Sequence, residues 1–277
     1  MGDAIRYREA VERLGFSETH RHVVSWVTPQ SRVLELGCAS GYLGKILIET
    51  KGCRVTGVEL DRDAAREARE NGLDVIEGSL EDAQFRQTIR DRFDFVLATD
   101  VLEHLRDPAA VLENFKQWLA PHGRAIIAVP NVATWQIRSQ LFFRGDFEYQ
   151  ETGILDRTHV HFFTWYTLRK LVSEQGWSVV DTMEEWSLPF GGGILDAPKD
   201  VRLYLEKLTS GGWPGRLASA GLHGWAAGLE KAAERVANKI YRRWPNACAA
   251  HMALLLAAPN GATGPFTAPS PRPSEQS

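Results

Sequence analysis

Hydrophobic and polar positions follow two alternating patterns along the first half of the chain. Short apolar runs, such as RVLEL at 32–36, alternate with segments in which apolar residues recur every three or four positions. The first pattern is typical of buried strands and the second of amphipathic helices. The predicted strands are 32–36, 54–58, 73–76, 93–98 and 124–129. The predicted helices between them are 42–49, 61–71 and 108–119.

The regular alternation of strands and helices predicts an α/β fold. Parallel strands are joined by right-handed helical crossovers, which cover both faces of the sheet. Beyond Pro130 the pattern indicates helices at 135–143 and 164–175 and two further strands at 177–186 and 249–257. We therefore expect a doubly wound, mostly parallel, seven-stranded sheet of the Rossmann-like kind.

Less regular segments flank this core and divide the chain into predicted regions. Residues 1–30 are expected to form N-terminal helices that act as a lid, with Ser17 as a helix cap. The core is predicted at 31–190 and contains an acceptor segment at 131–163. A helical insertion and the last strand occupy 191–258, with helical spacing over 199–243. The tail 259–277 is rich in Pro, Gly, Ser and Thr and is predicted to be disordered.

Composition narrows the class of protein further. The 277 residues carry a formal net charge of −3, whereas nucleic-acid binders usually have a basic excess. The three cysteines, Cys38, Cys53 and Cys248, lack metal-pair spacing and do not suggest a disulfide scaffold. The first residues lack the apolar centre of a secretion signal, and no apolar run is long enough to span a bilayer. We therefore expect a cytoplasmic protein without a nucleic-acid partner.

The most informative motif is VLELGCASGY at 33–42, where a predicted strand runs into a glycine turn and then a helix. In open α/β sheets, ligands bind beyond the carboxyl ends of the strands. Gly37 and Gly41 allow a sharp turn and the close approach of a ligand. Glu35 precedes the turn, where its carboxylate would repel a pyrophosphate but suits the ammonium of an amino-acid-like ligand. Because the spacing also differs from G-x-G-x-x-G, a dinucleotide-dependent oxidoreductase is the weaker alternative.

Residues after the next two predicted strands could complete a nucleoside site. Glu59 follows the turn at a distance where an acidic side chain can bind both hydroxyls of a ribose. Leu60 could pack against an adenine, and Ser79 could meet the adenine edge together with backbone groups. Asp61 and Asp82 fit equally well as solvent-exposed helix caps.

Several of these runs resemble a known family. VLELGCASG, GVELD, FDFVLATDVLEHLRDP and GRAIIAVPN are similar to the motifs of class I S-adenosylmethionine-dependent methyltransferases. The segments 130–138 and 153–164 resemble the ubiquinone-type and O-antigen-cluster sugar methyltransferases within that class. The chain departs from the family at Ala39, where many relatives have a third glycine, and at Ser79, where many have Asp.

The resemblance implies S-adenosylmethionine as the cofactor and assigns roles to the motif residues. The turn residues and Glu35 would hold the methionine end, Glu59 would hold the ribose, and the region of Asp100 would line the methyl-donor side. The cofactor-binding residues predicted in this way are Glu35, Gly37, Cys38, Gly41, Glu59, Leu60, Ser79, Leu80 and Asp100.

Methyl transfer from a sulfonium requires alignment of the reacting atoms more than activation of the donor. A hydroxyl acceptor must also lose a proton, for which a histidine or carboxylate near neutral pKa is suited. His104, which follows the fourth predicted strand, is the first choice for the general base, and Asp156 and His159 are expected to close the pocket. Each histidine could instead make a structural hydrogen bond. Glu103 could join these three residues around a divalent cation, but we predict no metal.

The acceptor is predicted from segments outside the core motifs. The long, aromatic-rich stretch at 144–163 favours an acceptor-binding lid, although many of its aromatic residues could be ordinary core. The basic excess over 199–243 could meet an anionic acceptor or a membrane surface. We expect O-methylation of a carbohydrate or small-molecule hydroxyl, in polysaccharide or secondary-metabolite biosynthesis, by a chain that could form oligomers. The alternatives are N-methylation of an amino sugar or natural product, and a non-catalytic cofactor-binding module.

Overall fold

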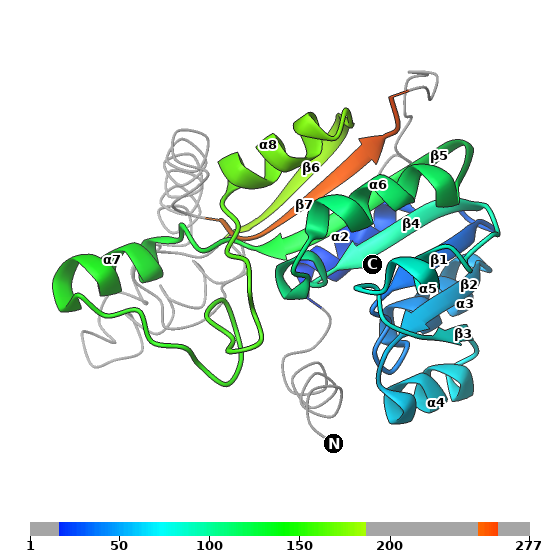
Figure 1. The fold of residues 1–277 in the computed structure, drawn as a ribbon, viewed down its shortest axis with the longest axis horizontal. Coiled ribbons are helices and arrows are strands. Elements are labelled where there is room, and N and C mark those ends of the chain that lie inside the picture. The colour runs from blue at the N-terminus through cyan, green and yellow to red at the C-terminus, as the bar shows by residue number, and fades with distance from the viewer. Residues whose placement is uncertain (1–16, 187–248, 260–277) are drawn as a thin grey trace, which may run out of the picture.

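The computed structural model of the chain describes residues 17–186 and 249–259, which form one open sheet with helices on both faces (Figure 1). The sheet has seven strands in the order β3-β2-β1-β4-β5-β7-β6. Neighbouring strands from β3 to β5 are parallel, whereas β7 is antiparallel to both β5 and β6. The strands are β1 (Arg32–Leu36), β2 (Arg54–Glu59), β3 (Asp74–Glu77), β4 (Phe93–Thr99), β5 (Leu119–Pro130), β6 (Ser178–Trp186) and β7 (Ala249–Ala257). The predicted doubly wound, mostly parallel, seven-stranded sheet is therefore confirmed.

Helices cover the sheet in two layers, with α6 and α8 on one face and α2 on the opposite face (Figure 1). Phe115 of α6 and Leu168 of α8 belong to one buried cluster, whereas Trp26 of α2 and Leu47 of α3 belong to the other. The helices are α2 (Glu18–Trp26), α3 (Tyr42–Lys51), α4 (Arg62–Glu70), α5 (Ala83–Arg86), α6 (Pro108–Trp118), α7 (Trp135–Arg144) and α8 (Trp165–Glu174), with a 3₁₀ turn η1 (Leu102–His104).

The strands divide their side chains between these two clusters. In β5, Ile127 and Val129 belong to the cluster that contains α6, and Ile126 and Ala128 to the cluster that contains α2. Successive residues of a strand point to opposite faces, so a strand covered on both sides must be apolar throughout. This explains the unbroken apolar runs in the sequence.

The sequence signals for helix ends also correspond to local structure. The side chain of Ser17 accepts a hydrogen bond from the backbone N–H of His20 and caps α2, as predicted. Thr164 caps α8 and forms a reciprocal pair with Thr167. Pro108 lies in the first turn of α6, where its missing N–H costs no helical hydrogen bond.

Two short elements were not predicted. Helix α5 has four residues and none of them is buried, so it produces no apolar periodicity in the sequence. The turn η1 consists of Leu102, Glu103 and His104, and its first two side chains are buried. A single turn is too short to show a helical repeat, although η1 positions two of the candidate site residues.

Some predictions lie outside the described residues. These are the part of the N-terminal helices within residues 1–16, the helical stretch 199–243 and the tail beyond Pro259. The division of the chain into regions therefore stays a prediction. Within the described ranges, no helix has the length and apolar character needed to cross a membrane.

Candidate functional site

The glycine turn joins β1 to α3 through three residues in the left-handed backbone region. Gly37, Ala39 and Gly41 have φ angles of 59°, 48° and 76°. A Cβ atom at Gly37 would lie 2.9 Å from a methyl group of Val101, and one at Gly41 would lie 2.9 Å from the backbone of Ala68. Glycine is therefore required at both positions on conformational and steric grounds. Ala39, in the place of a third glycine, adopts the same conformation at a cost of roughly 1–2 kcal/mol.

Glu35 lies buried beneath the first turn of α3, with 5% of its surface exposed. Its carboxyl group faces the backbone N–H of Gly44, and a Cβ at Gly44 would lie only 2.7 Å from Oε2. Burial raises the pKa of Glu35 to about 8. Oε2 has no hydrogen-bond partner within the described part of the chain. A buried carboxyl oxygen that lacks a donor fits the ammonium end of an amino-acid-like ligand, directly or through water.

Glu59 connects the end of β2 to the glycine turn. One carboxylate oxygen accepts a hydrogen bond from the backbone N–H of Ala39 at 2.8 Å. The other accepts from the N–H groups of Leu60 and Asp61, both at 2.8 Å. A carboxylate has about four acceptor positions, and these three bonds leave about one of them for a hydroxyl group. The position therefore fits a carboxylate that accepts a hydrogen bond from a ribose.

The remaining residues predicted for the nucleoside lie at the ends of β1, β2 and β3. Leu60 has 69% of its surface exposed and is free to cover a flat ring. Ser79 accepts a hydrogen bond from the N–H of Glu81 at 3.2 Å in the turn after β3. Cys38 and Leu80 are both buried, at 4% and 8% exposed, and their side chains belong to the core clusters.

Asp61 and Asp82 act as helix caps. Asp61 accepts hydrogen bonds from the N–H groups of Asp63 and Ala64 at the start of α4. Asp82 accepts one from Gln84 at the start of α5. The structural alternative for these two residues is therefore the one observed.

Asp100 follows β4 directly and has a φ of 55°, which is rare for a residue other than glycine. Its N–H donates to the carbonyl of Ala128 at 2.9 Å. Its Oδ1 lies 2.8 Å from Nε2 of His251 in β7. Burial alone would lower the pKa of His251, but the Asp100 carboxylate raises it to about 9. The two side chains therefore form a charged pair, about a quarter exposed, at the carboxyl edge of the sheet.

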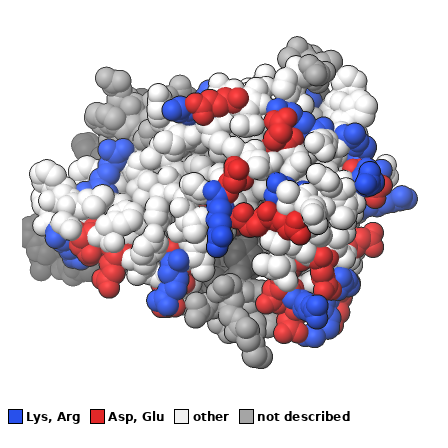
Figure 2. All heavy atoms as spheres, in the orientation of Figure 1, with Lys and Arg blue, Asp and Glu red and all other residues white. Residues whose placement is uncertain are grey.

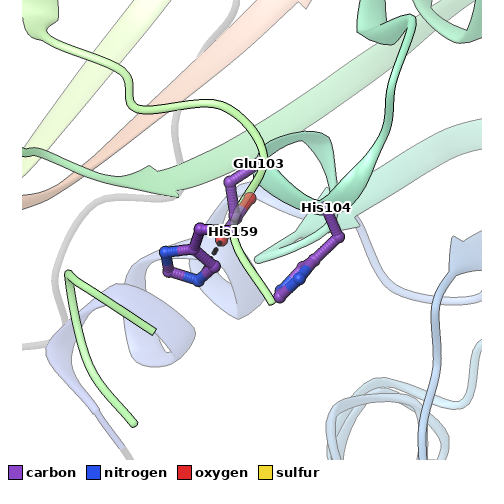
Figure 3. A group of neighbouring side chains, drawn as sticks. All are labelled: Glu103, His104 and His159. Atoms are coloured by element: carbon purple, nitrogen blue, oxygen red, sulfur yellow. Dashed lines mark ion pairs between the residues drawn. The ribbon is translucent and has the colours of Figure 1, made fainter. Parts of the chain in front are cut away.

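The predicted base His104 lies beside His159 and Glu103, as Figure 3 shows. The ring centroids of His104 and His159 are 4.8 Å apart, and Nε2 of His159 is 4.0 Å from the Glu103 carboxylate. Glu103 is 1% exposed, and neither of its oxygens accepts a hydrogen bond from a described residue. Burial, together with the Asp100 charge, raises the pKa of Glu103 and favours its neutral form.

Backbone carbonyls orient the ring of each histidine in this cluster. Nδ1 of His104 lies 3.3 Å from the carbonyl of Thr158, and Nδ1 of His159 lies 3.0 Å from that of Ile154. If Nδ1 carries the proton in each ring, Nε2 is left as a proton acceptor. His161 instead has its Nε2 3.1 Å from the carbonyl of Arg106. His104 is exposed and His159 is buried, so His104 is the more accessible of the two.

The side chain of Asp156 lies outside this cluster. Its Oδ1 accepts hydrogen bonds from the N–H and the hydroxyl of Thr158, at 2.8 and 2.7 Å. Its carbonyl accepts from the N–H of His159. The structure thus brings His104, His159 and Glu103 together, whereas the Asp156 side chain stabilises the turn that carries His159. Ligand atoms of Glu103, His104 and His159 lie within 4.8 Å of one another, and Asp156 is outside that set.

Sequence reasoning missed two histidines near Asp100, of which His251 is about a quarter exposed and His20 is buried. His251 is the one polar residue in the apolar run AAHMALLLAA, which is a signal that could have identified it. His20 of α2 is 7% exposed and interacts electrostatically with both Asp100 and His251. Burial lowers the pKa of His20. Nothing in the sequence pattern distinguishes His20 from the other polar residues of α2.

Charged side chains are mixed on the face shown in Figure 2. Acidic and basic groups alternate there, and several acidic groups gather near the middle of the face, so no continuous basic strip is visible among the residues coloured. A strip of that kind is the usual mark of contacts with a phosphate backbone.

The strand order, the antiparallel β7 and the acidic glycine turn after β1 define a class I S-adenosylmethionine-dependent methyltransferase fold. Within that class the chain belongs to a single family. The family model described as "Methionine biosynthesis protein MetW" matches residues 17–185.

Curated relatives match less than half of the chain. The ubiquinone biosynthesis O-methyltransferase of Idiomarina loihiensis is 32% identical over 131 residues, which are 44% of this chain and 51% of that protein. The protein of the same name from Aeromonas salmonicida is 28% identical over 118 residues, 39% of this chain and 49% of that protein. The chain spans about half the length of these relatives. A glycine/sarcosine/dimethylglycine N-methyltransferase of Actinopolyspora halophila is 28% identical over 142 residues, 48% of this chain and 23% of that protein.

Solved structures share the fold at low sequence identity. A methyltransferase of Thermotoga maritima, described as a possible histamine N-methyltransferase, is 19% identical with a TM-score of 0.50 and covers 68% of this chain and 85% of its own. The magnesium protoporphyrin IX methyltransferase of Synechocystis, solved with bound S-adenosylhomocysteine, is also 19% identical with a TM-score of 0.50. It covers 65% of this chain and 80% of its own. The predicted fold class is thus confirmed by neighbours with different acceptors.

Proposed function

We propose that the chain is an S-adenosylmethionine-dependent methyltransferase that acts on a small-molecule hydroxyl. The observation that carries the proposal is the linkage of Glu35, the left-handed glycine turn and Glu59 at the carboxyl ends of β1 and β2. Membership in the MetW family and the fold support it. A dinucleotide site is disfavoured because the spacing of the glycine turn differs from G-x-G-x-x-G and an acidic residue, Glu35, precedes the turn.

The donor binds across the ends of β1, β2 and β4. Glu59 accepts a hydrogen bond from the ribose, and the exposed Leu60 packs against the adenine, whose edge meets the turn at Ser79. The free oxygen of Glu35 attracts the ammonium of the methionine end. When bound, S-adenosylmethionine supplies a methyl group carried on a positively charged sulfur. The residues around it mainly set distance and alignment.

His104 removes the proton of the acceptor hydroxyl. Its Nδ1 faces a backbone carbonyl, which leaves Nε2 to accept the proton, and its ring is exposed at the carboxyl edge of the sheet. His159 and the neutral Glu103 lie behind it and close the pocket, with Asp156 stabilising the turn that carries His159. The exposed Phe142, Phe143 and Tyr149 of α7 and the following segment offer apolar surface for an acceptor.

The O-methyltransferase names of the relatives from Idiomarina and Aeromonas favour a hydroxyl as the acceptor group. A carbohydrate or a small phenol in polysaccharide or secondary-metabolite biosynthesis fits this chemistry. N-methylation is the second candidate, because the relative from Actinopolyspora is named for it. A neutral amine has no proton to lose before attack, so the two candidates differ in their need for His104.

The test is S-adenosylhomocysteine release from S-adenosylmethionine with three probe acceptors: catechol, a nucleotide sugar and glycine. We expect turnover with a hydroxyl acceptor and a loss of roughly 10²–10⁴-fold in His104→Ala, the usual range for a general base. His122→Ala is the matched control, because His122 is exposed near the start of β5, whereas the cluster follows the carboxyl end of the parallel strand β4. Turnover with glycine alone, equal in both variants, would contradict O-methylation and the role of His104.

A further inference from the structure

The pair formed by Asp100 and His251 joins the last strand to the candidate donor site. In the sheet register, His251 lies opposite Pro130 at the end of β5 and opposite Glu185 on β6. Its Nε2 is 2.8 Å from Oδ1 of Asp100, which follows β4. About a quarter of each side chain is exposed, so the pair is accessible at the edge of the sheet where β1 and β4 end.

The backbone fixes the position of Asp100 beside the glycine turn. Ala98 of β4 pairs with Leu36 of β1, so the residues that follow these two lie at the same level of the sheet. Val101 lies so close to Gly37 that a Cβ there would be 2.9 Å from its methyl group. The left-handed φ of 55° at Asp100 is costly for a side chain other than glycine, and the N–H of Asp100 is held by Ala128. The strained backbone therefore holds Asp100 next to the residue that packs against the turn, with its carboxylate paired to His251.

We propose that His251 is a positioning residue for the methyl donor: its imidazolium holds the Asp100 carboxylate, as an anion, beside the glycine turn where the positively charged methionine end binds. This inference rests on the proposed function. It adds to the donor site a residue from the far end of the chain, outside the motifs of β1 and β2.

The surroundings of the pair make the positive charge of His251 important. Four charged or titratable side chains interact electrostatically with His251, with Asp100 or with both: His20 of α2, Glu185 of β6, and Glu103 and His104 of η1. Burial alone would raise the pKa of Asp100, but His251 is the principal cause that lowers it. Burial lowers the pKa of His20, so this second histidine is a poor substitute as a cation. Without His251, Asp100 should take up a proton at a higher pH.

The test compares the affinity for S-adenosylhomocysteine, which keeps the ammonium group, in His251→Gln, His251→Lys and the unchanged full-length chain. Calorimetric titrations are run at pH 5.5 and pH 8. We express the affinity of His251→Gln as a ratio to that of the unchanged chain, and we expect this ratio to fall about tenfold from pH 8 to pH 5.5. A change of that size corresponds to a difference of about one pH unit between the protonation of Asp100 in the two chains. The Lys variant retains a cation, so its ratio should stay within about threefold. Melting temperatures verify that each variant is folded.

His122→Gln is the control and should match the unchanged chain at both pH values. Asp100→Asn provides a second measure that does not depend on the folding of the His251 variants, and it should weaken binding at both pH values without the added pH dependence. A ratio that does not change with pH in His251→Gln, or full affinity in Asp100→Asn, would overturn the positioning role. If the unchanged chain does not bind S-adenosylhomocysteine at any pH, the proposed function itself fails and the inference falls with it.

Discussion

At the scale of single residues, Glu35 and Asp100 show what local sequence can and cannot predict. Glu35 stands in a motif, and the structure places its carboxyl group beneath α3 near the turn, where the motif suggested. The environment of Asp100 depends on His251, which is 151 positions away in the chain. Spacing along the chain contains no information about that contact, because it forms only when β7 pairs with β5.

The buried carboxyl group of Glu35 makes the free energy of unfolding depend on pH. Its pKa is about 8 in the folded chain, against an ordinary value of 4.5. Between these two values the unfolded chain has released the proton that the folded chain retains, so stability falls as pH rises through this window. The fall is at most about 1.4 kcal/mol per pH unit and ends above the folded pKa.

Glu35→Gln removes this titration. Relative to the unchanged chain, we expect the free energy of unfolding of Glu35→Gln to rise steadily from pH 5 to pH 8 and then level off. Urea denaturation at several pH values measures it. Glu49→Gln, on the exposed side of α3, the helix that covers Glu35, should give a constant difference. A difference that is also constant for Glu35→Gln would mean that Glu35 is ionised in the folded chain.

At the scale of elements, the long periodic segments were predicted well and the short ones were not. The strand at 249–257 has the predicted bounds and lies within an apolar run delimited by Asn246 and Pro259. Strand β5 begins at Leu119, five residues earlier than predicted, because Leu119 pairs with Phe93 across an irregular register. Helix α5 and turn η1 lack the length that a pattern needs.

Helix α2 is anchored to the last two strands by polar contacts that pattern reasoning could not predict. The N–H and hydroxyl of Thr19 both donate to one oxygen of Glu185, which is 5% exposed. The indole N–H of Trp26 donates to Asp181 at 3.0 Å. These contacts hold α2, which contains His20, beside Asp100 and His251, so the helix contributes to the walls of the site.

Thr19→Val tests this anchor. The change keeps the shape of the side chain but removes one donor from a buried carboxylate, so we expect a loss of about 1–3 kcal/mol in the free energy of unfolding. Ser25→Ala removes an exposed hydroxyl from the same helix and should change stability by less than about 0.5 kcal/mol. Equal effects of the two substitutions in urea denaturation would show that the contact with Glu185 does not stabilise α2.

At the scale of the whole molecule, the sheet order follows from simple rules except at one edge. Parallel strands with right-handed crossovers could be predicted from the alternation of strands and helices. The insertion of β7 between β5 and β6 could not, because it brings the end of the described chain into the middle of that edge. The site depends on the insertion of β7, because β7 supplies His251.

Two truncations test the importance of β7. Deletion of 260–277 removes residues whose composition cannot offset the entropy of ordering, so we expect the melting temperature to change by less than about 2 °C. Deletion of 249–277 also removes β7. Among the described residues, β7 is the only strand that pairs with β6 and the only antiparallel partner of β5. We expect that chain to lose cooperative thermal unfolding in circular dichroism. A cooperative transition near that of the full chain would contradict this.

The central claim is that the turn after β1 and the end of β2 bind S-adenosylmethionine rather than a dinucleotide. The most direct measurement is a calorimetric titration of the full-length chain with S-adenosylhomocysteine and, separately, with NAD. We expect S-adenosylhomocysteine to bind and NAD not to bind. Glu59→Ala should weaken binding by about 2–4 kcal/mol, because hydrogen bonding between the ribose and a charged group is lost. Binding of NAD in place of S-adenosylhomocysteine, or unchanged affinity in a folded Glu59→Ala variant, would contradict the assignment.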